Sequence, residues 1–546
     1  MARVACLELR ISRHYFPNPL TFAISRLVHG SEVATGEPTS KTTSSTLPRH
    51  IAPQTPIQHI ISPQSPIQIA SAVHRMDLSA GAGLDDAAEW RTRSPGGTEH
   101  SWCRAVPGGT GATLLALRLS RDAAAEASAA QAALRSLQNA HPVLRARLRT
   151  TPSGPTLAFP NPGPPPAPLL PLAPLPAPDA APDFDALLEH ELNRNPWADP
   201  ETSDEGAPVL FATLYELPPA TGGAALFVRI HTVACDRSAA NALARDLVAL
   251  LGGGDEEELE PEDAAAEAAL EERIPQRDTW KPFWARGLDM VGYSINGLRT
   301  STLPLQETGT ERSTQMLRLG LGGDETTRLL DACKENGVRL CSAMTAATML
   351  AARQSKPLES GRQETYSVVT LINCRKFLEP ALDDHNVGFF YSAITNTHTI
   401  DGEEGLWELA KRCHDSYTSA KSNKKHLTDI SDLNFLMCRA IENPQLTTAG
   451  ALRTALVSVF EDPVVADVAE LQGKAGVEDC VCCATVHGIG PSIGVFDSIK
   501  DGRLDLACVY PSPLHSRKQV QEIFDKVKQI LHHAADEDLE DFADCN

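Results

Sequence analysis

The sequence predicts a mixed α/β (α+β) fold built from two lobes. The chain has 546 residues, which is enough for two large cores. Strand-like and helix-like apolar patterns alternate before residue 254 and again after residue 281. Between these two halves, three glycines lead into the acidic run 255–272, whose like charges favour an extended linker. We therefore expect mixed sheets flanked by helices in each half.

Composition shifts divide the chain further. We predict an N-terminal lobe over 76–254, an acidic linker over 255–280, a C-terminal lobe over 281–535 and an acidic tail over 536–546. Residues 1–75 are rich in Ser, Thr and Pro and poor in acidic residues, so they cannot form a core. Two interpretations of this segment stay open: an unstructured extension upstream of a start at Met76, or an organelle transit peptide. The Pro-rich segment 151–182 is predicted to be an irregular loop.

Charge and cysteine usage exclude several classes of function. The formal net charge of -21 argues against a nucleic-acid partner, and no apolar run is long enough to span a membrane. The 13 cysteines have no regular spacing, which is typical of a reducing compartment. We expect a cytoplasmic protein, or a chloroplast one if residues 1–75 are a transit peptide. Cys480, Cys482 and Cys483 lack a second Cys/His pair at ligand spacing, so we predict a strand there and no metal.

In the first half, an Ala-rich helix is expected over 121–138 and a short helix over 184–192. The glycines at 108, 109 and 111 precede a strand instead of following one, so they predict a hairpin turn and not a phosphate loop. Strands over 209–216 and 225–230 then bring the chain to His231. A polar loop with Asp236 follows, where a carboxylate can cap the amphipathic helix that Leu243, Leu247 and Leu251 indicate.

In the second half, the aromatic segment 281–298 is expected to pack against both lobes. A strand over 315–321, helices over 324–333 and 338–353, and a strand over 366–372 follow. A helix over 405–422 ends in a basic cluster. Asp501-Gly502 between two alternating patterns predicts a hairpin, and Ser516 is expected to cap the final helix.

The stretch from His231 to Arg237, His-Thr-Val-Ala-Cys-Asp-Arg, resembles the HHxxxDG signature of the chloramphenicol acetyltransferase-like superfamily. That superfamily includes peptide-synthetase condensation domains, alcohol acetyltransferases and dimycocerosyl transferases. Asn386-Val-Gly388 and the closing order of strand, Asp-Gly, strand, Tyr-Pro and helix also resemble it, most of all its alcohol acetyltransferase and dimycocerosyl transferase branch. A set of plant condensation-domain-like proteins is similar too. The resemblance spans residues 97–531.

The resemblance implies a tunnel at the interface of the two lobes and an acyl transfer from acyl-CoA to a hydroxyl or an amine. In the signature, the second His is the general base and the Asp is structural. Here Thr232 replaces that His and Arg237 replaces the Gly. Catalytic roles then fall to His231 as the base and Thr232 as an oxyanion donor. An interlobe ion pair is expected between Asp236 and Arg375.

Other site residues are implied by position. Asn386, Gly388, Ser392 and His487 are expected to bind substrate. Lys424 and Lys425 are candidates for a coenzyme A phosphate contact in an otherwise acidic chain. No permanently bound cofactor is expected, and the partners are a small-molecule acyl donor and acceptor; the oligomeric state stays open.

An alternative function follows from strand geometry. Adjacent side chains of a strand face opposite sides, so His231 and Thr232 should not share a face. If Thr232 occupies the base position, His231 points into the lobe core. The alternative is therefore a catalytically impaired, condensation-domain-like protein that binds a thioester, a metabolite or a protein.

Overall fold

The computed structural model describes residues 90–121, 123–160, 172–176, 182–198, 206–254, 268–359, 361–466 and 469–543. These residues belong to one compact unit that begins at Asp85. The expected extension over 1–75, most of the acidic run and part of the Pro-rich loop lie outside the described residues. Among the described helices, none is long and apolar enough to cross a bilayer.

The N-terminal lobe is built on a five-stranded sheet with the order β14-β2-β8-β7-β5. Its strands are β2 (Thr110–Leu119), β5 (Leu172–Ala173), β7 (Leu210–Glu216), β8 (Ala224–His231) and β14 (Val477–Val486). Every residue of β8 is buried, because helices cover both faces of the sheet. The covering helices are α4 (Ala123–Ala140) and α6 (Arg237–Leu251) on one face and α5 (Phe184–Leu192) on the other.

A small four-stranded sheet and a helix complete this lobe. The sheet has the order β1-β4-β3-β6, formed by β1 (Trp90–Arg93), β3 (Arg147–Thr151), β4 (Gly154–Pro160) and β6 (Ala207–Pro208). Helix α3 (Gly97–Ala105) leads through a short 3-10 turn into β2. The hairpin predicted at the glycines before β2 is therefore wrong: a helix, not a strand, precedes the turn.

The C-terminal lobe holds a mixed sheet with the order β11-β10-β12-β15-β16-β9. Its strands are β9 (Ser313–Gly320), β10 (Glu364–Asn373), β11 (Tyr391–Ile400), β12 (Arg453–Phe460), β15 (Gly490–Lys500) and β16 (Arg503–Ser512), with β13 (Val464–Ala466) beside β15. The contacts of β12 with β10 and β15 are parallel, and the others along the path are antiparallel. Asp501 and Gly502 join β15 to β16 with φ values of 48° and 74°, as a primed hairpin turn requires.

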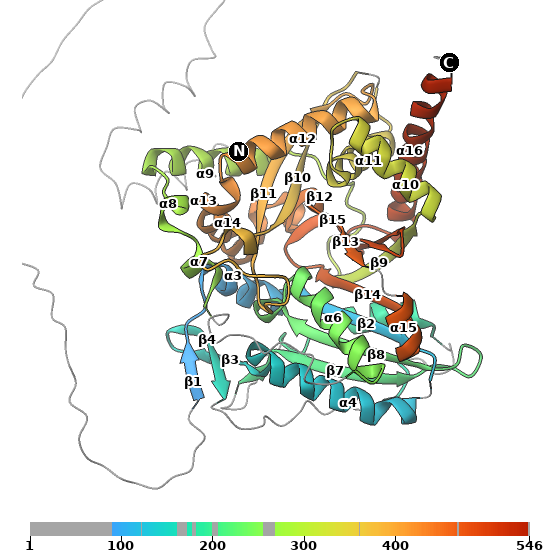
Figure 1. The fold of residues 1–546 in the computed structure, drawn as a ribbon. Coiled ribbons are helices and arrows are strands. Elements are labelled where there is room, and N and C mark those ends of the chain that lie inside the picture. The colour runs from blue at the N-terminus through green and yellow to red at the C-terminus, as the bar shows by residue number, and fades with distance from the viewer. Residues whose placement is uncertain are drawn as a thin grey trace, which may run out of the picture. The chain divides into compact units, whose positions relative to one another are not determined.

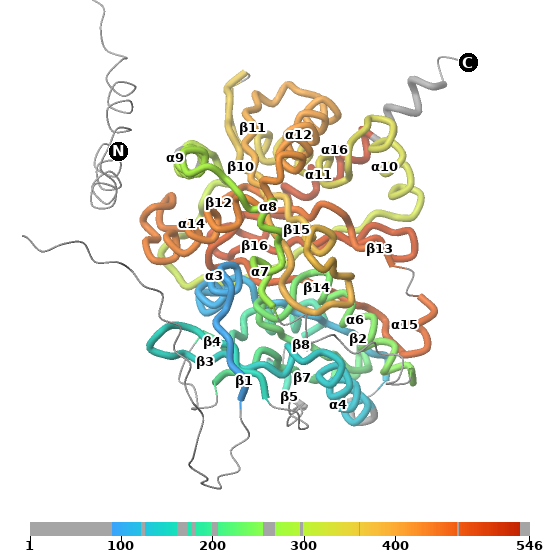
Figure 2. The backbone as a smooth tube through the Cα atoms, turned by 60° about the vertical axis from the view of Figure 1, so that its left-hand side comes forward, coloured from blue at the N-terminus to red at the C-terminus, as the bar shows by residue number. Residues whose placement is uncertain are grey.

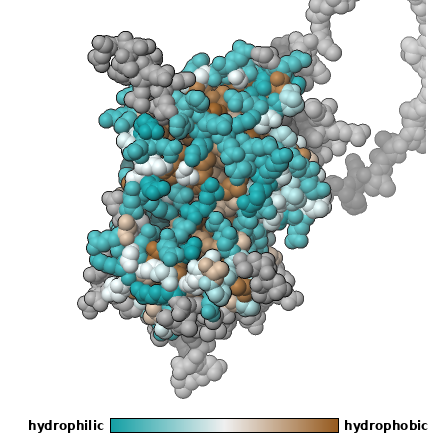
Figure 3. Space-filling model, turned by 90° about the vertical axis from the view of Figure 1, so that its right-hand side faces the viewer, coloured by the Kyte–Doolittle hydropathy of each residue, from teal (hydrophilic) through white to brown (hydrophobic). Residues whose placement is uncertain are grey.

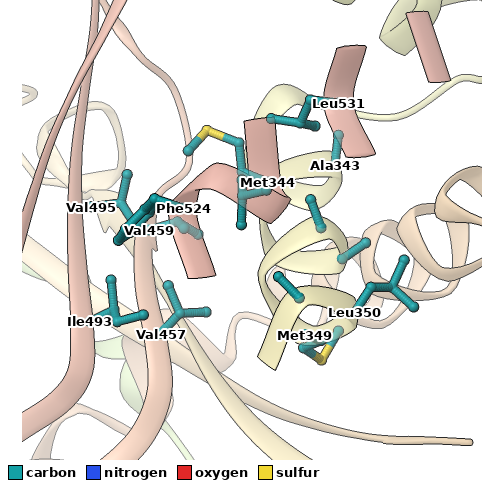
Figure 4. Close-up of a cluster of buried hydrophobic side chains, with 14 of the residues drawn as sticks. Ala343, Met344, Met349, Leu350, Val457, Val459, Ile493, Val495, Phe524 and Leu531 are labelled. Atoms are coloured by element: carbon teal, nitrogen blue, oxygen red, sulfur yellow. The ribbon is translucent and has the colours of Figure 1, made fainter. Parts of the chain in front are cut away.

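Helices α10 (Gly323–Glu335), α11 (Leu340–Gln354), α12 (Leu406–Ser422) and α16 (Arg517–Ala543) pack on this sheet. In the core, Val457 and Ile493 of the sheet face Met344 of α11 and Phe524 of α16 (Figure 4). Helix α11 is buried almost throughout, because its Ala, Ser and Thr side chains allow close approach on all sides. On the face that includes α10 and α16, hydrophilic residues predominate (Figure 3).

The two lobes share a strand. β14 comes from the second half of the chain and pairs antiparallel with β2, with Cys480 opposite Leu117 and Cys482 opposite Leu115 (Figure 1). Val481 and Cys483 face the α5 side of the sheet, and Cys480 and Cys482 face the other side. The cysteine-rich segment is thus a strand, as predicted, and it completes the sheet of the first lobe.

Short helices follow the described start of the linker at residue 268. They are α7 (Leu270–Arg273) and α8 (Gln276–Thr279), followed by the longer α9 (Phe283–Arg299), which contacts α13 (Lys425–Thr428) and α14 (Ile430–Glu442). The aromatic segment was expected to pack against both lobes, and this is wrong. Phe283 is 81% exposed and Trp284 is 57% exposed. The reason is that α9 turns its polar side inward, where Tyr293 donates a hydrogen bond to Asp429.

Candidate functional site

The signature stretch lies where β8 meets α6. β8 ends at His231, residues Thr232–Ala234 form a 3-10 turn, and Asp236 is the N-cap of α6. The Asp236 carboxylate accepts a hydrogen bond from the Ala239 amide at 2.9 Å. Such a cap satisfies a free amide and places a negative charge at the positive helix end, which fixes the loop between strand and helix.

His231 points into the core of the first lobe. Its side chain is buried, and its ring meets the Trp197 ring edge-on at a centroid distance of 5.2 Å. Nδ1 accepts a hydrogen bond from the Val233 amide at 3.1 Å, so the neutral ring carries its hydrogen on Nε2. Burial lowers the pKa of His231 to about 3. With its lone pair bound to a backbone amide, His231 is held in a structural role and not in the role of a base.

Thr232 is also fully engaged. Its hydroxyl donates to the Gly111 carbonyl oxygen and lies 3.4 Å from Thr113 Oγ1. Gly111 has φ of +91°, and a Cβ there would lie 3.1 Å from Thr232 Oγ1 and 2.7 Å from the Trp102 ring. The single hydroxyl proton of Thr232 is therefore committed to the backbone. An oxyanion would have to compete with Gly111 for it.

The interlobe ion pair predicted between Asp236 and Arg375 is present. Arg375 Nη1 and Nη2 lie 2.8 and 3.2 Å from the two Asp236 oxygens, and both side chains are buried. Asp236 also accepts from the Phe390 amide at 2.8 Å, and its own amide donates to the Gly388 carbonyl at 2.9 Å. Arg375 in turn donates to the Asn386 carbonyl at 2.8 Å. Backbone groups of the Asn-Val-Gly segment thus bind both members of the pair.

Arg237 makes a second buried bridge that the sequence did not reveal. Its Nη2 lies 2.8 Å from Asp497 Oδ1 of β15, and its Nη1 donates to the Asp462 carbonyl at 3.0 Å. The guanidinium sits 4.0 Å from the centre of the Phe460 ring. The N-cap Asp236 and the next residue, Arg237, thus bind a basic and an acidic partner, respectively, in the second lobe. The replacement of the signature Gly by Arg was the available signal, because only a long side chain reaches β15.

His487 lies at the turn between β14 and β15, close to the start of β2. Its Nδ1 is 2.9 Å from Thr314 Oγ1, and its ring covers Gly109, where a Cβ would collide with it. Burial, together with the charges of Arg453 and Arg312, lowers its pKa to about 4. Gly109 and Gly111 are two residues apart, so His487 and Thr232 contact neighbouring parts of one segment.

The other predicted site residues are not gathered here. Ser392 pairs with Ile372 in the register and shares its face with Ile394, which packs toward Tyr417 of α12. The Ser392 side chain therefore lies on the face of the strand that α12 covers, and its role in binding substrate stays a prediction. Lys424 is exposed and pairs with Asp278 of α8, whereas Lys425 is half-buried and pairs with Asp289 of α9.

No group of three or more His, Cys, Asp or Glu side chains that could hold a metal ion occurs in the part of the chain that the structure describes. Several side chains that shape the site were not found from the sequence. They are Trp102, Trp197, Arg237, Thr314 and Arg453. Their positions depend on contacts between segments that are far apart in the chain.

Comparison with known proteins identifies the fold. Residues 310–420 match the family model described as phthiocerol/phthiodiolone dimycocerosyl transferase C-terminus. No curated protein matches the chain in a sequence search. The trichothecene 15-O-acetyltransferase from Fusarium sporotrichioides has a similar structure, with a TM-score of 0.60 and 12% identity over 83% of this chain and 100% of that chain.

Two further structures extend the likeness. Polyketide synthase associated protein 5 from Mycobacterium tuberculosis has a TM-score of 0.54 and 14% identity, covering 81% of this chain and 97% of that chain. The NRPS cyclization-docking bidomain from Sorangium cellulosum has a TM-score of 0.56 and 14% identity, covering 81% of this chain and 84% of that chain. The chain therefore has the two-lobe fold of the chloramphenicol acetyltransferase-like, condensation-type proteins, as predicted.

Proposed function

We propose that the protein is an acyltransferase that moves an acyl group from an acyl-CoA thioester to a hydroxyl or an amine. The observation that carries this proposal is the acyltransferase fold, together with the match of residues 310–420 to a dimycocerosyl transferase family model. In the reaction, the acceptor oxygen or nitrogen bonds to the thioester carbonyl carbon, the carbon–sulfur bond breaks, and the acceptor proton ends on the released thiol. A base near the acceptor accelerates this step by about 10²- to 10⁴-fold.

His487 is the imidazole best placed to act as that base. It is only half-buried and lies against the segment that also contacts Thr232. A pKa near 4 keeps the ring neutral at pH 7, so one nitrogen holds a lone pair. Arg453 and Arg312 help to lower this pKa. An anionic donor bound beside them would offset their charges and raise the basicity of the ring.

The test is an assay of the full chain with acetyl-, malonyl- and aromatic acyl-CoA against mixed alcohols and amines. Thiol release and the acylated product are both measured. We expect His487→Gln to lower turnover by about 10²-fold or more, because the amide keeps a bond to Thr314 but cannot accept the proton. His385→Gln, an exposed residue bonded to Arg245, serves as the control. Equal turnover of His487→Gln and the wild type would refute the assignment of the base.

A second candidate is a protein that binds a thioester or a metabolite without turnover. It is favoured by the contacts of His231 and Thr232, since both polar groups are bound to the backbone. In that case, the wild type binds acyl-CoA in calorimetry but releases no thiol. Turnover that appears only in Thr232→His would then identify a protein that lacks its base. If calorimetry detects no binding of any thioester, the acyltransferase and the thioester-binding protein are both refuted, and only a protein that binds another metabolite remains.

A further inference from the structure

Helix α9 is amphipathic, but its apolar side faces outward. Phe283, Trp284, Leu288 and Val291 are 81%, 57%, 63% and 50% exposed, and Trp280, just before the helix, is 75% exposed. At 100° per residue, the four helical positions lie within an arc of about 140°. A surface helix normally buries such an arc against the core.

The polar side of α9 contacts the rest of the protein. Asp289 pairs with Lys281, and Lys281 lies 2.7 Å from Asp429. Tyr293 also bonds to Asp429, and Arg286 lies 3.5 Å from Asp432. On the helical wheel, Asp289, Tyr293 and Arg286 lie roughly opposite the apolar arc. Ion pairs and hydrogen bonds therefore orient the helix so that its apolar arc stays outside.

Basic side chains are numerous on α8, on α9 and in the adjoining segment 421–425. Lys424 bonds to Asp278 of α8, and Lys425 lies 3.3 Å from Asp289 of α9. Arg277, Arg286 and Arg299 are exposed residues of α8 and α9, and the first two also pair with Glu379 and Asp432. The helix pair and the adjoining segment 421–425 thus carry an excess of basic side chains in a chain of net charge -21. Figure 2 brings α7, α8 and α9 forward, on the side away from α10 and α16.

We propose that the outer face of α8 and α9, defined by Trp280, Phe283, Trp284, Leu288 and Val291, docks on the surface of an anionic lipid bilayer. A helix with Trp, Phe and Leu on one side and cations on its polar side lies in the plane of the headgroups. Trp side chains favour this depth because their rings are amphipathic. Anionic headgroups complement the local cations, whereas the acidic remainder of the chain keeps other faces off the membrane. This inference does not depend on the proposed acyl transfer.

The test is flotation of the full chain with vesicles of phosphatidylcholine and phosphatidylserine. Trp284→Ser and Leu288→Ser should each lower the partition coefficient about tenfold or more, because each removes a large apolar side chain from the interface. Val465→Ser is the matched control, since Val465 is 72% exposed on β13, far from α9 in Figure 1. Its partition should equal that of the wild type.

The contribution of the cations is tested separately. Lys424→Gln should lower partition about fivefold, the effect of one basic residue near an anionic surface. Lys474→Gln, in an exposed pair with Glu470, is its control and should have no effect. Equal binding to vesicles of phosphatidylcholine alone would overturn the assignment to anionic lipid. A wild type that does not float overturns the proposal, and light scattering that shows a dimer lost in Trp284→Ser would assign the face to a second copy.

Discussion

The buried pair of Asp236 and Arg375 allows a quantitative test of how the lobes are joined. Asp236→Ala removes the partner of a buried guanidinium, which costs about 3 to 5 kcal/mol. It also removes the cap on Ala239, worth about 1 kcal/mol, and the acceptor of the Phe390 amide. We expect the free energy of unfolding to fall by about 4 to 6 kcal/mol.

The companion variants separate these contributions. Arg375→Met leaves the helix cap in place and should cost about 3 to 5 kcal/mol. The double variant Asp236→Ala/Arg375→Met leaves no unpaired charge, so its cost should fall well below the sum of the single changes. Lys474→Ala breaks the exposed pair with Glu470 and should leave the free energy of unfolding nearly unchanged, because water screens this pair. Urea and thermal unfolding measure all four, and single variants no more costly than Lys474→Ala would refute the reasoning.

Three further predictions concern neighbouring residues. Arg237→Gly leaves the Asp497 carboxylate buried without its partner, so urea unfolding should show a loss of stability of about 3 to 5 kcal/mol. Adding Asp497→Asn should recover much of this loss, and no recovery would contradict the pairing. In Gly111→Ala, the new Cβ is strained by a φ of +91° and also collides with the Trp102 ring. In Gly253→Ala, the φ of +87° causes similar strain but no atom lies near the Cβ, so Gly111→Ala should lower the melting temperature more. Equal shifts would mean that Trp102 moves aside without cost. Burial depresses the pKa of His231 to about 3 from its ordinary value of 6.5, so the unfolded state binds the proton first and stability falls as pH drops below about 6.5. At pH 5 the cost is about 2 kcal/mol. His231→Asn, which keeps an acceptor for the Val233 amide, should flatten that part of the stability profile in urea unfolding.

Much of the fold was predictable because it is encoded locally. Apolar periodicity located β8 and α6, and Asp236 stands where a helix cap is needed. The Asp501-Gly502 turn and the final helix after Ser516 follow from equally local signals. The pairing of Asp236 with Arg375 came from the resemblance to a known family, and not from any pattern within the chain.

The remainder depends on long-range contacts. An apolar arc on a helix normally predicts burial, and the aromatic segment 281–298 was expected to pack against both lobes. The acids Asp429 and Asp432, far along the chain, bind the polar side of α9 and leave its apolar side exposed. The alternation of side chains along a strand predicts that His231 and Thr232 point to opposite faces. It does not indicate that the His231 ring packs against Trp197 or that the Thr232 hydroxyl donates to the Gly111 carbonyl. The bridge from Arg237 to Asp497 joins residues 260 positions apart, a distance over which sequence spacing carries no information.

The placement of β14 has a consequence for synthesis on the ribosome. β2 and β8 leave the exit tunnel long before residues 477–486, so one side of β2 has no hydrogen-bonding neighbour during most of translation. The nascent first half is therefore exposed to aggregation until the chain is nearly finished. Chaperone demand should fall once β14, the last strand of this sheet to be synthesised, has left the exit tunnel. A fragment that stops at residue 254 lacks β14 and should be insoluble.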